Sequence, residues 1–307
     1  MKVGILFISI ILLVGCRPKW EETKKLAIAG NSIAQYNLGS LYFHGHEIEQ
    51  DYTKAAKWFE AAAAQGDMEA RYNLATMFHN GTGVKQDFKK AYELYTVPAN
   101  KGLAHAQNNL ATLYSGGSGV KKDPEKAFKW FRLAAMQGHH IAESNLASMY
   151  EFGIYVKRNY KKALFWYKLA ARAGLAQAQS SLGYMHEAGK GVKKDARKAL
   201  SLYKKAAIQK NASAEFHLGR LYAYGIAVKK DYQEAVKWYS KAAEQGLAEA
   251  QNNLAQCYEK GTGVEKDQEL AILWYGKAYD QGLPNAKANL KAMQIRIQKA
   301  QPKKSER

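Results

Sequence analysis

Apolar and small residues recur along this chain in a fixed register of 36 positions. Alanine follows four residues after each register position and leucine eight residues after it, and apolar pairs such as Leu41-Tyr42 and Leu113-Tyr114 come next. Spacing of i, i+4, i+7 and i+8 forms one stripe of an amphipathic helix, named here helix A of each repeat. The register position itself is glycine in seven repeats: Gly30, Gly66, Gly102, Gly138, Gly174, Gly246 and Gly282.

A second helix is predicted in each repeat after a glycine-containing loop. Residues 81–84 show the loop pattern, G-T-G-V, and an Asp or Asn such as Asp87 follows three residues later. Short acceptor side chains of this kind cap the free N–H groups at the start of a helix. An aromatic pair such as Trp58-Phe59 then stands among alanines on one stripe, named helix B. The next register glycine ends helix B, as a C′ glycine commonly does.

Each repeat is therefore a predicted hairpin of two helices with one apolar face on each. A single hairpin cannot bury these faces, so the hairpins must stack on one another. The sequence predicts an all-α fold, an α-solenoid of about seven repeats over residues 30–300, of which residues 283–300 form a last helix A. Residues 17–29 are expected to be a tether and an N-terminal half-repeat cap, and residues 301–307 a disordered tail.

Two positions break the pattern. Pro98 falls inside a helix B at the phase of Ala62, and a proline there removes one intrahelical hydrogen bond at a cost of about 3 kcal/mol. We therefore expect a kink or an early end near Thr96. Lys210 replaces a register glycine and would be strained by about 1–2 kcal/mol in a left-handed conformation, so Asn211 is expected to take that conformation instead.

The complete register resembles the Sel-one-like repeat (SLR) family, a relative of tetratricopeptide repeats. Residues 246–282, GLAEAQNNLAQCYEKGTGVEKDQELAILWYGKAYDQG, show the pattern well, and it recurs in phase over nearly all of residues 30–300. The resemblance implies a right-handed superhelix with a concave surface that binds proteins. Several bacterial members are exported and serve envelope or host-interaction roles. A subgroup with a disulfide in every repeat is disfavoured, because Cys257 occupies an apolar phase of helix A and is interpreted as a small core residue.

The first sixteen residues indicate a cellular compartment. One lysine precedes an apolar run over residues 3–14, which is the pattern of a secretory signal peptide and is too short to span a bilayer. The run ends in Leu13-Val14-Gly15-Cys16, which resembles a bacterial lipobox, so residues 1–16 are expected to be a lipoprotein signal peptide with Cys16 lipidated. The alternative is an ordinary secretory signal or a short anchor. Because Arg17 and not Asp follows the cysteine, resemblance to enterobacterial sorting implies the outer membrane.

Composition and charge narrow the possible partners and exclude several kinds of site. The chain has 307 residues and a formal net charge of +19, which favours an anionic partner. Nucleic acid is disfavoured because export removes the protein from it. Two distant cysteines exclude a disulfide framework and a cysteine-rich zinc module. Ser201-Leu-Tyr-Lys204 matches an S-x-x-K motif only because Tyr203 continues the aromatic phase, and no metal or nucleotide motif is found. We expect no enzyme activity, no cofactor and no metal site.

An asparagine recurs in helix A beside its buried leucine. In tetratricopeptide relatives such an asparagine faces the concave groove and binds peptide backbone, so the column could hold an extended peptide. The alternative is local hydrogen bonding that fixes the hairpin, and the sequence favours neither. Ser181 and His217 interrupt the column. Its members are Asn37, Asn73, Asn109, Asn145, Asn253 and Asn289.

The loop before helix B carries a pair of basic residues in several repeats. Such pairs would form a ridge along one edge of stacked repeats, able to meet anionic lipid, lipopolysaccharide or an acidic protein, with a strength that falls as salt rises. The alternative is that these are solvated loops that aid solubility. Lys157-Arg158 is one pair, and the lysine pairs are Lys121, Lys122, Lys193, Lys194, Lys229 and Lys230.

Together these features predict an exported, lipid-anchored scaffold for protein–protein interaction at the bacterial envelope, with a host-interacting factor as a variant. Its expected partners are a protein or peptide in the concave groove and the membrane through Cys16. A peptidoglycan-associated accessory or hydrolase-like cell-wall protein is the alternative, and a non-exported adaptor comes third.

Overall fold

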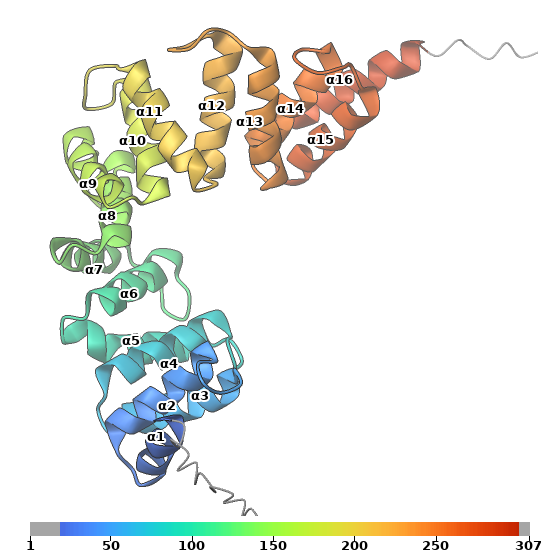
Figure 1. Ribbon diagram of the computed structural model, residues 1–307. Helices are drawn as coiled ribbons and strands as arrows, with labels where there is room; N and C mark the ends of the chain where they lie inside the picture. The colour runs from blue at the N-terminus through green and yellow to red at the C-terminus, as the bar shows by residue number, and fades with distance from the viewer. Residues whose placement is uncertain (1–18, 301–307) are drawn as a thin grey trace, which may run out of the picture. The chain divides into compact units, whose positions relative to one another are not determined.

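The computed structural model describes residues 19–300, and every regular element in that range is an α-helix (Figure 1). The helices A are α2 (Ser32–His44), α4 (Met68–Asn80), α6 (Ala104–Gly116), α8 (His140–Phe152), α10 (Ala176–Ala188), α12 (Ala212–Tyr224), α14 (Ala248–Lys260) and α16 (Pro284–Ala300). The helices B are α1 (Lys19–Ile28), α3 (Tyr52–Ala64), α5 (Phe88–Asn100), α7 (Pro124–Met136), α9 (Tyr160–Arg172), α11 (Ala196–Ile208), α13 (Tyr232–Glu244) and α15 (Gln268–Asp280). The alternating pattern of two helices per repeat is confirmed.

The chain divides into two compact units, one up to residue 134 and one from residue 135. In the first unit each helix from α1 to α6 packs against the next along the chain, and in the second the same holds from α8 to α16. None of the helices in the described range has the length and apolar character needed to traverse a bilayer. Cys16 and the predicted tail, residues 301–307, lie outside the described residues.

The core of each repeat is built from the predicted alanine, leucine and aromatic phases. In the second unit Tyr203 of α11 and both Leu218 and Leu221 of α12, the helix A of the next repeat, are completely buried in one cluster. Trp238 of α13, the helix B that follows α12, packs against this cluster. Small alanines let the helices approach, while the large side chains fill the space between consecutive hairpins. Burial of this shared face is what makes one repeat depend on its neighbours.

Caps and glycines set the ends of the helices. Asp51 Oδ1 accepts a hydrogen bond from Lys54 N at 2.9 Å at the start of α3, and the same contact recurs at most helices B. In the loop after α4, Gly83 has φ +68°, and a Cβ there would lie 2.4 Å from the backbone carbon of Tyr52. Only glycine combines that conformation with so close an approach to α3.

The structure differs from the sequence-based expectation at both positions that break the pattern, Pro98 and Lys210. Helix α5 continues to Asn100, so the early end near Thr96 is wrong. Pro98 lies in the last turn, where a single lost hydrogen bond is tolerated, and its carbonyl oxygen accepts from Leu103 N at 2.9 Å. Lys210 itself is left-handed at φ +59°. Asn211 does not take that conformation, because it caps α12 with Oδ1 accepting from Ala214 N at 2.9 Å.

Candidate functional site

The helix A faces of the second unit enclose a cavity of about 380 Å³. Three helices A, α8, α10 and α12, supply most of its wall, and hydroxyl and amide groups predominate in it. Two exposed aromatic residues, Phe152 and Tyr184, line the cavity beside these polar groups. The polar lining consists of Ser144, Asn145, Ser148, Glu151, Tyr167, Gln177, Ser180, Ser181, Ser213 and His217.

Two serines of the cavity lining stand at a helix A phase that is aromatic in three other repeats. Ser144 of α8 and Ser180 of α10 occupy the helix A phase that holds Tyr36 in α2, Tyr72 in α4 and Phe216 in α12. In the first unit Tyr36 and Tyr72 pack against the helix B aromatics of their own repeats. At Ser144 and Ser180 the same phase instead places a small hydroxyl side chain in the cavity wall.

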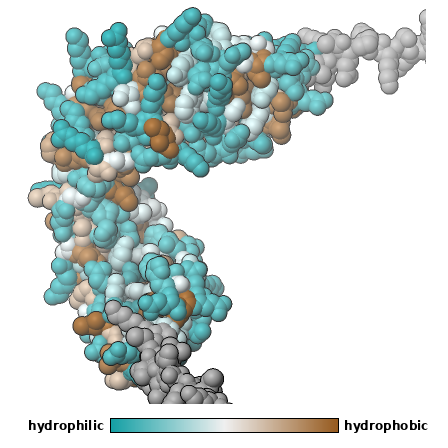
Figure 2. Space-filling model, in the orientation of Figure 1, coloured by the Kyte–Doolittle hydropathy of each residue, from teal (hydrophilic) through white to brown (hydrophobic). Residues whose placement is uncertain are grey.

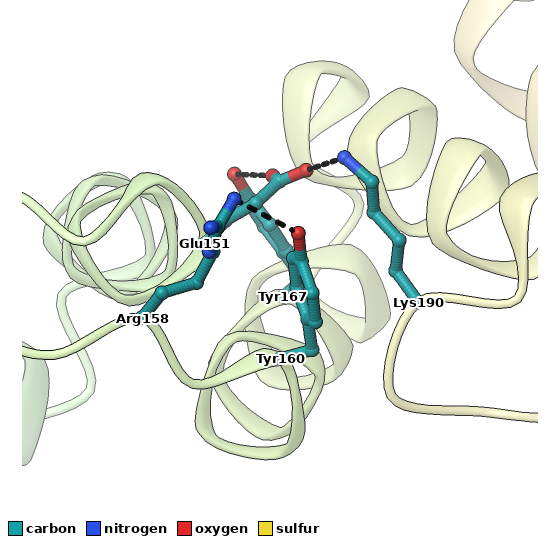
Figure 3. A network of polar contacts seen from close by, with 5 residues as sticks. All are labelled: Glu151, Arg158, Tyr160, Tyr167 and Lys190. Carbon is teal, nitrogen blue, oxygen red and sulfur yellow. Dashed lines mark hydrogen bonds and ion pairs between the residues drawn. The ribbon is translucent and has the colours of Figure 1, made fainter.

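The buried Glu151 carboxylate belongs to the cavity wall, and Figure 3 shows its contacts with Tyr167 and Lys190. The Glu151 side chain is 4% exposed. The Tyr167 hydroxyl donates to its Oε2 at 3.1 Å, and Lys190 Nζ lies 3.2 Å from its Oε1. Burial lowers the pKa of Lys190, but the Glu151 carboxylate outweighs this effect and the net pKa is raised. Burial, followed by the same carboxylate, raises the pKa of Tyr167 well above its usual value.

A second carboxylate is bound in the same way one repeat later. The Tyr203 hydroxyl donates to Glu187 Oε2 at 2.7 Å, His217 Nδ1 lies 3.4 Å from that oxygen, and Arg220 Nη2 lies 3.6 Å from Oε1. Burial alone would raise the pKa of Glu187, but His217, Tyr203 and Arg220 stabilise the carboxylate and the pKa is lowered. The His217 ring stacks on Tyr203 with centroids 4.7 Å apart.

Other repeats form smaller cavities on the same helix A faces. A cavity of about 340 Å³ in the first unit lies between α2 and α4 and is lined by Ser40, Asn73 and Thr76. A cavity of about 230 Å³ in the second unit lies between α12 and α14 and includes Asn253 and Gln256. The predicted column phase therefore lines cavities in three places, together with the helix A phase three residues after it, which is occupied by Ser40, Thr76, Ser148 and Gln256.

The asparagine column is divided between the two readings that the sequence left open. Asn73, Asn145 and Asn253 line cavities. Asn109 Nδ2 donates to the Tyr95 hydroxyl at 3.1 Å, and Asn289 Nδ2 donates to Asn252 Oδ1 at 3.0 Å. Asn253 also hydrogen-bonds the buried Tyr239, and Asn37 is exposed. One phase thus serves both the surface and the contact between successive hairpins, because each of these hydrogen bonds joins a helix A to the preceding repeat.

The six ridge lysines are all exposed. Lys121 and Lys122 lie in the loop after α6 in the first unit, whereas Lys193, Lys194, Lys229 and Lys230 lie in two consecutive loops of the second unit. Figure 2 shows hydrophilic residues over much of the visible face, with apolar residues scattered among them. The exposure of the loops fits both the ridge and the solubility readings.

The residues that the sequence analysis considered as candidate reactive groups do not lie together in a site. Cys257 is 9% exposed in an apolar cluster, and burial raises the pKa of its thiol to about 11. Ser201 is exposed on α11, outside the cavities described above. Over residues 19–300 no group of His, Cys, Asp and Glu is arranged to hold a metal ion. The sequence did not single out Glu151, Ser144, Ser180 or Lys190, because the residue type varies from repeat to repeat at each of these phases.

Comparisons with known proteins agree with the repeat architecture. A family model described as the Sel1 repeat matches residues 32–67, 69–102, 104–139, 140–175, 176–211, 212–247 and 248–283. The chain is similar to a Sel1 repeat protein from Oxalobacter formigenes, with 34% identity, a TM-score of 0.68 and coverage of 89% of this chain and 79% of that one.

Two further similarities differ in extent. A protective antigen present in uropathogenic Escherichia coli strains, which displays an SLR fold, is 36% identical with a TM-score of 0.51, covering 91% of this chain and 68% of that one. A Sel1-like repeat-containing protein of Acanthamoeba polyphaga mimivirus is 40% identical over 47 residues. That alignment spans 15% of this chain and only 8% of the length of the viral protein.

Proposed function

This chain belongs to the Sel1 repeat family, and on that premise we propose that it is an exported, lipid-anchored scaffold that binds protein partners at the bacterial envelope. The observation that carries the binding role is the recurrence of polar cavities on the helix A faces. Hydroxyl and amide groups such as those of Ser148, Asn73 and Asn145 line these cavities, and such groups can hydrogen-bond the backbone of an extended peptide.

The envelope location rests on the first sixteen residues. A single positive residue, an apolar run and the sequence before Cys16 fit a lipoprotein signal. Two or more acyl chains on the cysteine would hold the protein at a membrane stably, where one chain would not. The intact mass of the membrane fraction tests this. Wild type should carry the acyl mass and Cys16→Ala should not, whereas an unmodified, soluble wild type would contradict the anchor.

Crosslinking in cells tests the binding role. A photoreactive amino acid at Ser213, which lines the large cavity, should yield adducts with one or a few proteins. The same group at Ser201, exposed on helix B, is the matched control and should yield fewer. Equal adducts from both positions would contradict binding at the helix A face. Glycan strands recovered from Ser213 without protein would favour the peptidoglycan-associated alternative.

The exposed lysine loops offer a second, salt-dependent contact. Lys193, Lys194, Lys229 and Lys230 lie in consecutive loops of the second unit, and such a cluster attracts anionic lipid headgroups or an acidic protein surface. Changing all four to Gln should lower co-sedimentation with anionic vesicles at low salt. Vesicles of neutral lipid are the control. Unchanged co-sedimentation of the variant would show that these loops serve solubility alone.

A further inference from the structure

Lys190 occupies a cage that the rest of the second unit builds for an ammonium group. Its Nζ lies 3.2 Å from the buried Glu151 carboxylate and 5.5 Å from the ring centroid of Tyr160 (Figure 3). The ring centroid of Tyr184 lies 4.5 Å from the same Nζ. A carboxylate with two ring faces is a strong environment for an alkylammonium ion. Three other repeats have Thr or Ser at this loop phase, as at Thr82, so the lysine is not needed to form the loop.

The cage opens onto a cavity with unused hydrogen-bonding groups. Ser144 is 7% exposed and Ser180 is 2% exposed, and both line the cavity next to Glu151. Within the part of the chain that the structure describes, no hydrogen bond of either serine side chain is seen, and neither Oγ is among the buried polar atoms that lack a partner, so both hydroxyls are accessible from the cavity. A hydroxyl both donates and accepts hydrogen bonds, so these two groups suit a polar ligand that has donors and acceptors.

The charge of the helix A faces suits a cationic ligand despite the basic chain. Helices α8, α10, α12 and α14 carry six glutamates and only two basic residues, Arg220 and Lys260. Helices α9 and α11, which are helices B, carry four basic residues each and no acidic one. Positive charge is therefore concentrated on α9, α11 and the loops, and the helices A of these repeats carry more acidic than basic residues.

We propose that this cavity binds a partner peptide whose lysine side chain pairs with Glu151, and that the Lys190 ammonium holds that position when no partner is bound. The incoming ammonium replaces that of Lys190 at Glu151, so the buried carboxylate stays paired throughout the exchange. Lys190 is 25% exposed and lies between Gly189 and Gly191, so its side chain can leave for water. The Ser144 and Ser180 hydroxyls then pair with the peptide amides beside the lysine. This inference rests on the proposed scaffold function and specifies its ligand.

A titration with a small probe tests the site in the full chain. The probe is Nα-acetyl-lysine methylamide, a lysine side chain between two peptide amides, and binding is followed by NMR chemical shifts. Lys190→Thr installs the residue that Thr82 provides in another repeat, and it should bind the probe at least tenfold more tightly than wild type. Lys193→Thr, in the same loop, is the matched control and should behave as wild type.

The controls separate the charge of the probe from its shape. Adding Glu151→Gln to Lys190→Thr should abolish the gain, and the norleucine analogue of the probe, which lacks the amine, should not bind. Thermal unfolding of each variant confirms that it is folded. Equal affinity of wild type and Lys190→Thr would overturn the proposal, as would equal binding of the norleucine analogue or tighter binding of N-acetylglucosamine. Because the titration involves no cellular partner, its failure beside specific crosslinks from Ser213 would remove only the lysine site.

Discussion

The Tyr167 hydroxyl donates a 3.1 Å hydrogen bond to the Glu151 carboxylate, which ends the preceding helix A sixteen residues earlier. The same pair recurs as Tyr203 with Glu187 and as Tyr275 with Glu259, each at 2.7 Å. In each case a cation further along the chain completes the contact: Lys190, Arg220 and Arg296. The pair thus joins the two helices of one hairpin and, through the cation, the following repeat.

Removing the Tyr167 hydroxyl should lower the free energy of unfolding, because the buried Glu151 carboxylate depends on its hydrogen bond. Tyr167→Phe should destabilise the chain by about 1–3 kcal/mol, because Glu151 loses a hydrogen bond that water cannot replace. Equilibrium unfolding in urea measures this. Tyr232→Phe is the matched control, since Tyr232 is 40% exposed, and it should change stability by less than about 0.5 kcal/mol.

A double variant distinguishes the pair from general packing. Phe131 occupies the Tyr167 phase in another repeat, and Ser115 stands there in place of the carboxylate. Glu151→Ser combined with Tyr167→Phe should therefore lose less stability than the sum of the two single changes. Strict additivity would show that the tyrosine and the glutamate act independently.

His186 should make the stability of the second unit depend on pH. It is 2% exposed, and neither ring nitrogen has a hydrogen-bond partner in the described chain. Burial, followed by the charge of Lys198, lowers its pKa below the ordinary value of 6.5. The folded state therefore resists protonation, so this contribution to stability is present above pH 6.5 and is lost as the pH falls below it.

His186→Phe tests that dependence with a residue the repeat already uses. Phe78 occupies the same phase in α4, and the change should stabilise the chain by about 1–3 kcal/mol by removing an unpaired buried polar group. The difference in unfolding free energy between the variant and wild type should widen from pH 7 to pH 5. His46→Asn, at an exposed loop position, should follow wild type. A difference that stays constant with pH would place the titration elsewhere.

The repeat architecture could be predicted because every hairpin meets the same packing requirement, so its phases recur in the sequence. The cavity could not be predicted, because the residue at the phase of Ser144 and Ser180 varies from repeat to repeat. Whether neighbouring side chains leave space beside it depends on the packing of three helices A, which the sequence does not specify. Pro98 was misjudged for a related reason, since its cost depends on how many turns remain in α5.

Cys257 should be chemically inert while the chain is folded. The thiolate is the reactive form of cysteine, and the pKa of about 11 leaves almost none of it at pH 8. In the Cys16→Ala variant, which retains this single thiol, a thiol reagent at pH 8 should react at least a hundredfold more slowly in native buffer than in 6 M guanidinium. Free glutathione in the same native buffer controls for the reagent itself. Rapid labelling in native buffer would show that the α14 core opens readily.

Lys210 has a strained left-handed backbone, whereas the glycines at the same register position in other repeats adopt positive φ without strain. It adopts φ +59°, whereas the register position elsewhere is glycine with φ near +90°, as at Gly246. Relief of about 1–2 kcal/mol of strain should exceed the entropic cost of a new glycine, about 0.5–1 kcal/mol. Lys210→Gly should therefore stabilise the chain by up to about 1 kcal/mol in urea unfolding. Lys205→Gly, at an exposed position inside α11, is the matched control and should destabilise it by about 1 kcal/mol. Equal loss from both changes would mean that the Lys210 conformation carries no strain.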